Sequence, residues 1–160
     1  MIKNWECERI ILDMIESEVD PDISILAMET GIRFLDAFKR EFVRSCIWQC
    51  EGLLRVLSFA DKMFVTLDKF GAVVVWTTGE DKGKLECRKR GSIDGGRSLC
   101  LYKLSDATYF AVGLQRKLLV MNCSLERKHE EKFDKEAIEF LFMAPDSIMA
   151  CFQDVKFLDI

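Results

Sequence analysis

The chain has 160 residues, of which 49% are hydrophobic and 31% are charged, and its formal net charge is −4 at pH 7. This length suffices for one domain with a substantial core, and the composition excludes a mainly disordered protein. The acidic balance gives no electrostatic footprint for nucleic acid or for an anionic membrane surface, so neither is an expected partner.

Residues 1–52 have an apolar spacing that predicts helices. In NWECERIILDMIESEV, the side chains of Trp5, Ile11 and Ile15 fall on one side, and the DPD sequence that follows is a signal for a new helix. In the next stretch apolar residues recur at steps of three and four, namely Ile32, Leu35, Phe38 and Phe42. We therefore expect a helical N-terminal segment over 1–52.

Beyond residue 52 the pattern changes. Short runs rich in Val, Leu, Phe, Cys and Met alternate with turns of Asp, Gly, Lys and Asn, as in MFVTL, AVVVW and KLLVMNC. Such runs are typical of β-strands. The second part of the chain, 53–160, is therefore expected to be a β-rich repeat region.

Three segments of this region can be aligned with one another: LSFADKMFVTLDKFGAVVVWTT, YKLSDATYFAVGLQRKLLVMNC and FMAPDSIMACFQDVKFLDI. Each has a strand that ends in a turn with an aspartate, a second strand, a polar turn and a third strand. The aspartates are Asp61, Asp106 and Asp146, so they are 45 and 40 residues apart. A repeat of this length with four strands is that of a β-propeller blade.

The aligned segments resemble the blades of WD-repeat proteins. Trp76, at the end of AVVVW, stands at the tryptophan position of that family, and Asp159 stands where the aspartate of its Trp-Asp pair would lie. The family usually has a turn aspartate at the place of Phe70, and the nearest aspartate here is Asp68. The resemblance implies a partial β-propeller with blades at about 53–97, 98–137 and 138–160.

So few blades do not close a ring, and an exposed sheet edge is a template for pairing. A partner supplies the missing sheets, or the chain is a fragment or reduced copy of a longer propeller, or the repeat is accidental. In the last case the helices of residues 1–52 would pack on one curved antiparallel sheet, which gives an α+β domain.

Residues with the spacing of a catalytic or metal site are few. His129, the only histidine, lies in the charged run ERKHEEKF, and GSIDGGRS lacks the spacing of a phosphate-binding loop. The seven cysteines form no zinc-binding pairs, which favours reduced, mostly buried thiols. With no signal peptide and no transmembrane run, the sequence predicts an intracellular protein, cytoplasmic or nuclear, that needs no cofactor and no metal.

The aromatic side chains of the N-terminal segment are candidate partner-binding residues, although they also suit the core of a helical pair: Trp5, Phe38, Phe42 and Trp48. The sequence thus predicts a non-enzymatic protein-interaction scaffold, a subunit of a multi-protein complex. Its partners, or a second copy of the chain, would complete the β-sheets or dock on their edges. The alternatives are a self-contained α+β domain with a small-ligand pocket and a small cysteine-dependent enzyme.

Overall fold

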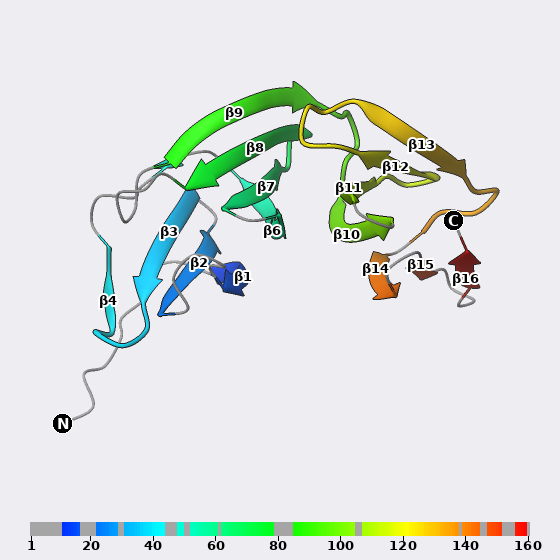
Figure 1. The fold of residues 1–160 in the computed structure, drawn as a ribbon. Helices are drawn as coiled ribbons and strands as arrows, with labels where there is room; N and C mark the ends of the chain where they lie inside the picture. The colour runs from blue at the N-terminus through cyan, green and yellow to red at the C-terminus, as the bar shows by residue number, and fades with distance from the viewer. Residues whose placement is uncertain are drawn as a thin grey trace.

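The regular elements of the described residues are all strands. The computed structural model describes residues 11–16, 22–28, 31–43, 48–49, 52–60, 62–78, 85–104, 107–137, 139–144, 147–151 and 156–159. Strands β1 to β16 in these ranges form four antiparallel sheets, which follow one another along an arc (Figure 1).

Each sheet is built from strands that are consecutive in the chain. Sheet 1 contains β1 (Ile11–Glu16), β2 (Ile23–Met28), β3 (Gly31–Asp36), β4 (Glu41–Phe42) and β5 (Trp48–Gln49). Sheet 2 contains β6 (Leu53–Ala60), β7 (Met63–Asp68), β8 (Ala72–Thr78) and β9 (Leu85–Ser92). Sheet 3 contains β10 (Ser98–Leu104), β11 (Ala107–Gly113), β12 (Lys117–Met121) and β13 (Arg127–Lys132). Sheet 4 contains β14 (Glu139–Ala144), β15 (Ser147–Cys151) and β16 (Lys156–Asp159).

The strands of sheet 1 follow the same plan as those of sheets 2 and 3. Both β4 and β5 pair with β3, β4 through Leu35 and Phe42 and β5 through Ile32 and Trp48. Since β2 occupies the other edge of β3, the two short strands lie one after the other in the place of a single fourth strand. Sheet 1 is therefore a four-stranded meander with an interrupted outer strand.

Apolar clusters fill the space between successive sheets. On β7, Phe64 belongs to the cluster between sheets 1 and 2, whereas Val65 belongs to the cluster between sheets 2 and 3. On β12, Leu119 packs toward sheet 2 and Leu118 toward sheet 4. Because neighbouring side chains of a strand point to opposite faces, sheets 2 and 3 are apolar on both faces, and each is held between two other sheets.

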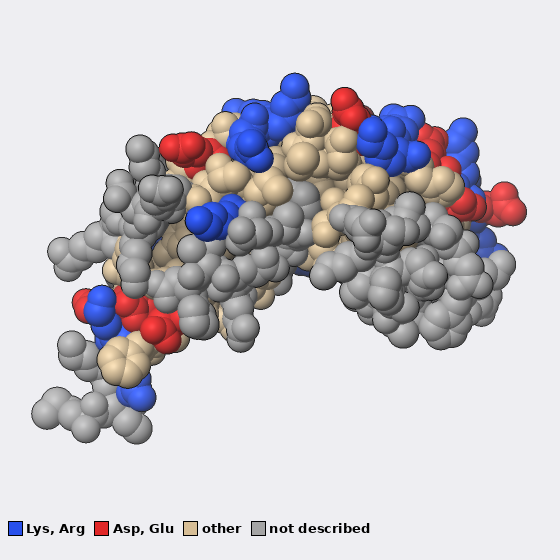
Figure 2. All heavy atoms as spheres, viewed as in Figure 1, with Lys and Arg blue, Asp and Glu red and all other residues tan. Residues whose placement is uncertain are grey.

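The first strands of successive sheets contact one another, β1 with β6, β6 with β10 and β10 with β14. They lie toward the inside of the arc, and the fourth strands β9 and β13 lie along its convex side (Figure 1). Basic and acidic side chains are interspersed over this convex side (Figure 2). On β9 the side chains of Glu86 to Arg90 are all exposed.

The prediction of helices in residues 1–52 is wrong for the described part of that segment, which contains strands β1 to β5. The physical reason is burial on both faces. In β2, five of the six residues are buried, including the consecutive run from Ile25 to Met28, so the strand lacks the alternation of a half-exposed strand and its apolar residues also fit helical spacing. The α+β alternative, which required those helices, is not supported either.

Sheet 1 is a further copy of the repeat that was expected only after residue 52. The second strands of the four sheets begin at residues 23, 63, 107 and 147, so they start 40, 44 and 40 residues apart. Within the described residues, no helix of the length and apolarity needed to cross a membrane is found. The proposed domain and blade limits stay predictions.

Candidate functional site

Trp76, placed by the sequence at the signature position of the repeat, is a structural residue of β8. Its side chain is 5% exposed, and its indole Nε1–H donates a hydrogen bond to Oγ1 of Thr66 on β7 at 3.0 Å. Its ring stacks on Phe64, with 6.3 Å between ring centroids. These contacts fix β7 to β8 and place a large apolar ring between sheets 1 and 2. No pattern in the sequence had indicated the role of Thr66.

Asp68 organises the turn between β7 and β8. Its Oδ1 atom accepts hydrogen bonds from the backbone N–H groups of Phe70, at 2.9 Å, and Ala72, at 2.8 Å. The carboxylate therefore satisfies two donors of the turn from a position two residues before the place where the repeat family usually has its aspartate. Phe70 itself is 63% exposed.

The other signature residues have fewer described contacts. Asp61, Asp106 and Asp146 lie outside the described residues. Asp159 ends β16, where its backbone pairs with Ser147 of β15. Their expected role in the repeat stays a prediction.

The candidate partner-binding aromatics do not form one cluster in the described part of the chain. Trp5 lies outside the described residues, and Trp48 is described only as a backbone partner of β3. Phe38, in the turn after β3, is 85% exposed. Phe42 is half-buried, with the guanidinium of Arg33 5.3 Å from its ring centroid.

Turn carboxylates show the clearest electrostatic effects, and their cause is local. The backbone N–H of Lys39 donates to Asp36 at 2.8 Å and lowers the pKa of that carboxyl, with a further contribution from the Lys39 ammonium at 3.2 Å. The Lys128 ammonium, at 3.0 Å, and the Asn122 amide lower the pKa of Glu126 in the same way. These interactions order exposed turns and do not mark a reactive centre.

The outer face of sheet 1, meaning the face away from sheet 2, is a first candidate for binding. Ile25 and Ala27 of β2 pack toward sheet 2, so the alternate residues Leu26 and Met28 lie on the outer face. Met14 of β1 is paired with Leu26 and is 60% exposed. Arg33 is paired with Leu26 from the other side. Leu26 and Met28 are nevertheless buried, at 1% and 2% exposure, so Met14 is the exposed apolar side chain among these residues, and Arg33 adds a cation beside it.

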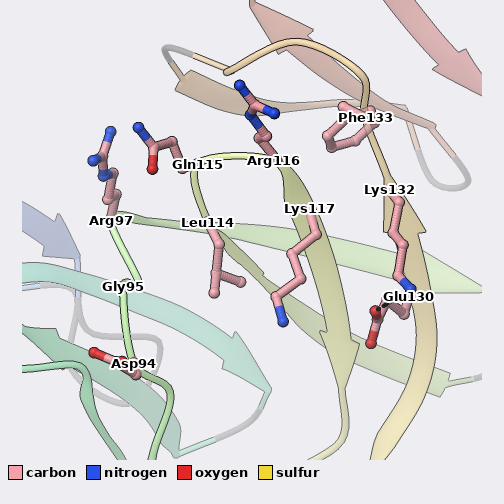
Figure 3. A pocket seen from close by; sticks show the side chains of 10 residues that line it. All are labelled: Asp94, Gly95, Arg97, Leu114, Gln115, Arg116, Lys117, Glu130, Lys132 and Phe133. Carbon is pink, nitrogen blue, oxygen red and sulfur yellow. Dashed lines mark ion pairs between the residues drawn. The ribbon is translucent and has the colours of Figure 1, made fainter.

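A groove at the edge of sheet 3 is the second candidate. It has a volume of about 520 Å³ and opens between the loop after β9, the turn between β11 and β12, and the end of β13 (Figure 3). Its walls carry four basic and two acidic side chains. The lining residues are Asp94, Gly95, Arg97, Leu114, Gln115, Arg116, Lys117, Glu130, Lys132 and Phe133.

The carboxylate of Glu130 already has basic partners within the protein. Arg127 lies 2.5 Å from it, and Lys132 lies 3.7 Å from it. By contrast, no ion pair joins Arg97, Arg116 or Lys117 to another residue in the described ranges. The groove thus presents three basic side chains whose charge is available to a ligand.

The described residues bring no set of catalytic or metal-binding side chains together. Among them, no group of three or more His, Cys, Asp or Glu side chains could hold a metal ion. His129 is exposed on β13, 3.4 Å from Glu131. Of the described cysteines, Cys87 is exposed, Cys100 is buried and Cys123 is intermediate.

No protein-family model matches the sequence, and no curated protein is similar to it by sequence alone. The structure is similar to the β-propeller domain of Cps50 (Swd1) from Myceliophteria thermophila, with a TM-score of 0.76 and 10% identity over 96% of this chain and 54% of that one. It is similar to Sqt1 of Saccharomyces cerevisiae, with a TM-score of 0.66 and 13% identity over 91% of this chain and 44% of the other. It is also similar to BamB from Moraxella catarrhalis, with a TM-score of 0.67 and 12% identity over 90% of this chain and 42% of that one.

The chain therefore spans about half, or less, of the length of these solved structures. At such low identity the similarity shows the fold alone. The four sheets are successive blades of a partial β-propeller, and that prediction from the sequence is confirmed.

Proposed function

We propose that this partial β-propeller is a non-enzymatic scaffold that binds other proteins within a multi-protein complex. The observation that carries the proposal is the outer face of sheet 1. Sheets 2 and 3 are covered on both faces by neighbouring sheets, whereas the outer face of sheet 1 presents Met14 at 60% exposure. Leu26 and Met28 of this face are already buried within the chain, so the support comes from the exposed side chain of Met14 on the first sheet of the arc.

The chemistry of the face indicates the kind of partner. Within the chain, each sheet covers the next by packing one apolar face on another. The partner that fits the outer face of sheet 1 is therefore a β-sheet with an apolar face, supplied by another polypeptide. Arg33 on the same face favours a partner with a carboxylate beside its apolar residues.

Pairing at the outer edges of the middle sheets is less favoured than this stacking. The exposed strand β9 carries Arg88, Lys89 and Arg90, and β13 carries Arg127 and Lys128. Charged side chains on an edge strand oppose the addition of a further strand. The scaffold is thus expected to bind through a face of the arc and not through its convex edges.

The test is the molar mass of the purified chain in solution, measured by light scattering over a concentration series. We expect the chain to associate, or to take up a partner β-sheet on co-expression, and we expect Met14→Asp to abolish this. Phe70→Asp is the matched control, because Phe70 is 63% exposed on a turn outside sheet 1. It should behave as the unmodified chain does.

The possible results of this experiment distinguish self-association through sheet 1 from an interface elsewhere and from no association at all. A defined oligomer that Met14→Asp dissolves would identify the partner sheet as that of a second copy. A monomer at every concentration that unfolds in one sharp transition and takes up no partner would refute the proposal. An equal effect of both substitutions would place the interface somewhere other than sheet 1.

A further inference from the structure

We infer that the groove at the edge of sheet 3 binds an acidic segment of a protein, in which carboxylates flank an apolar side chain. This goes beyond the proposed function, because the groove is made by sheet 3 and its loops and does not involve the outer face of sheet 1. The inference rests on the rigidity of the groove, its available charge and its apolar floor.

Backbone hydrogen bonds hold the walls of the groove in place. The N–H of Arg97 donates to the carbonyl of Gly113 at 2.9 Å, which ties the loop after β9 to β11. The N–H of Phe133 donates to the carbonyl of Arg116 at 2.9 Å, which ties the end of β13 to the turn between β11 and β12. A ligand therefore meets a largely preformed site and does not have to order these loops.

The basic side chains lie on both sides of the groove. Arg97 and Arg116 point to one side and Lys117 points to the other (Figure 3). Such an arrangement suits an extended segment that passes between them better than a single small anion held at one point. Arginine guanidinium groups also bind carboxylates through two parallel hydrogen bonds.

The floor and the remaining charges favour a peptide over a nucleic acid. Leu114 is 8% exposed and Phe133 is half-buried, and both line the groove, so an apolar side chain has a surface to cover. Asp94 and Glu130 line it as well and would repel a continuous phosphate backbone. The net charge of −4 gives the whole chain no general attraction for nucleic acid.

The experiment measures the binding of a short fluorescent peptide that alternates glutamate with leucine, by fluorescence anisotropy with the full chain. We expect binding that weakens as salt rises. Arg97→Ala combined with Arg116→Ala should lower the affinity by roughly tenfold or more, since each substitution removes a charged hydrogen-bond donor. The control, Arg88→Ala with Arg90→Ala, removes the same charge from exposed β9 and should bind as the unmodified chain does.

A single substitution that is expected to strengthen binding provides a second check. Asp94→Asn removes a carboxylate from the groove and should strengthen binding of the peptide, whether or not the arginine variant folds. Met14→Asp should leave peptide binding unchanged, so a failure here is distinguishable from a failure of the proposed scaffold function.

Several results would overturn the inference. These are no peptide binding at low salt, an equal loss in the groove variant and the β9 control, and equal binding of a peptide with lysine in place of glutamate. Tighter binding of a single-stranded oligothymidylate than of the peptide would assign the groove to nucleic acid instead.

Discussion

Replacing Trp76 by phenylalanine tests the hydrogen bond that joins β7 and β8. The substitution removes the indole N–H that donates to Thr66 Oγ1 at 3.0 Å, but it keeps an aromatic ring beside Phe64. The Thr66 side chain is 1% exposed and makes no other hydrogen bond within the described part of the chain. Its hydroxyl would therefore be left buried without its donor.

The expected loss follows from this burial. A buried polar group that loses its partner costs about 1–3 kcal/mol, and the smaller phenylalanine ring adds a packing loss on the order of 1 kcal/mol. Thr66→Val removes the hydroxyl while nearly keeping the shape of the side chain. The double variant has neither group, so its loss should be smaller than the sum of the two single losses by about 1–2 kcal/mol. A native domain typically has only about 5–15 kcal/mol of stability, so these differences are measurable.

The assay is urea unfolding of the unmodified chain, both single variants and the double variant, followed by far-ultraviolet circular dichroism. Tryptophan fluorescence is not suitable, because Trp76 is one of only three tryptophans. Losses that add without any coupling would mean that the bond contributes nothing in solution, and the reasoning from burial would be refuted.

Two further substitutions test how the β7–β8 turn is built. Gly71 has φ of 81°, and a Cβ atom there would lie 2.3 Å from the carbonyl oxygen of Ile93, so Gly71→Ala should cost roughly 2–4 kcal/mol through strain and collision. Gly95→Ala, at φ of 77° with open space around it, should cost only about 1 kcal/mol; equal urea midpoints for the two would contradict the close contact. Asp68→Ala should cost about 1–2 kcal/mol through two unpaired backbone N–H groups, and Asp68→Asn, which keeps an acceptor oxygen, should recover most of it in thermal unfolding. Equal melting temperatures for these two variants would show that the acceptor is unimportant.

The strands after residue 52 were predictable because their limits are marked by turn chemistry. The run AVVVW begins directly after Gly71 and four residues after Asp68, and the structure has β8 from Ala72 to Thr78. Gly71 supplies a positive φ and Asp68 supplies an acceptor for backbone donors. Composition therefore identifies both the strand and the turn before it.

The strands of sheet 1 were not predictable from the spacing of apolar residues alone. A strand buried on both faces has no alternation, and at short length its pattern also fits one side of a helix. One signal was available. Gly31 follows ISILAMET as Gly71 follows MFVTLDKF, and the two glycines are 40 residues apart.

The groove depends on contacts between parts of the chain that are distant in sequence. Its residues come from 94–97, 114–117 and 130–133. In the sequence, GSIDGGRS looks like an exposed connection and ERKHEEKF like a charged surface run. Only the pairing of β10, β11, β12 and β13 places the basic residues of the three segments around one apolar floor.

The stacking of the sheets also determines how the molecule should open. Each apolar cluster joins one sheet to the next along the arc. Stability in such an array is approximately the sum of the individual units and their nearest-neighbour interfaces, as in a one-dimensional chain of coupled units. Among the described residues, an inner sheet belongs to two of these clusters and must break both to unfold, whereas sheet 4 belongs to one. Amide hydrogens of Val75 and Ala111 should therefore exchange with solvent more slowly than that of Ile148, in a gradient that decreases toward the end of the arc.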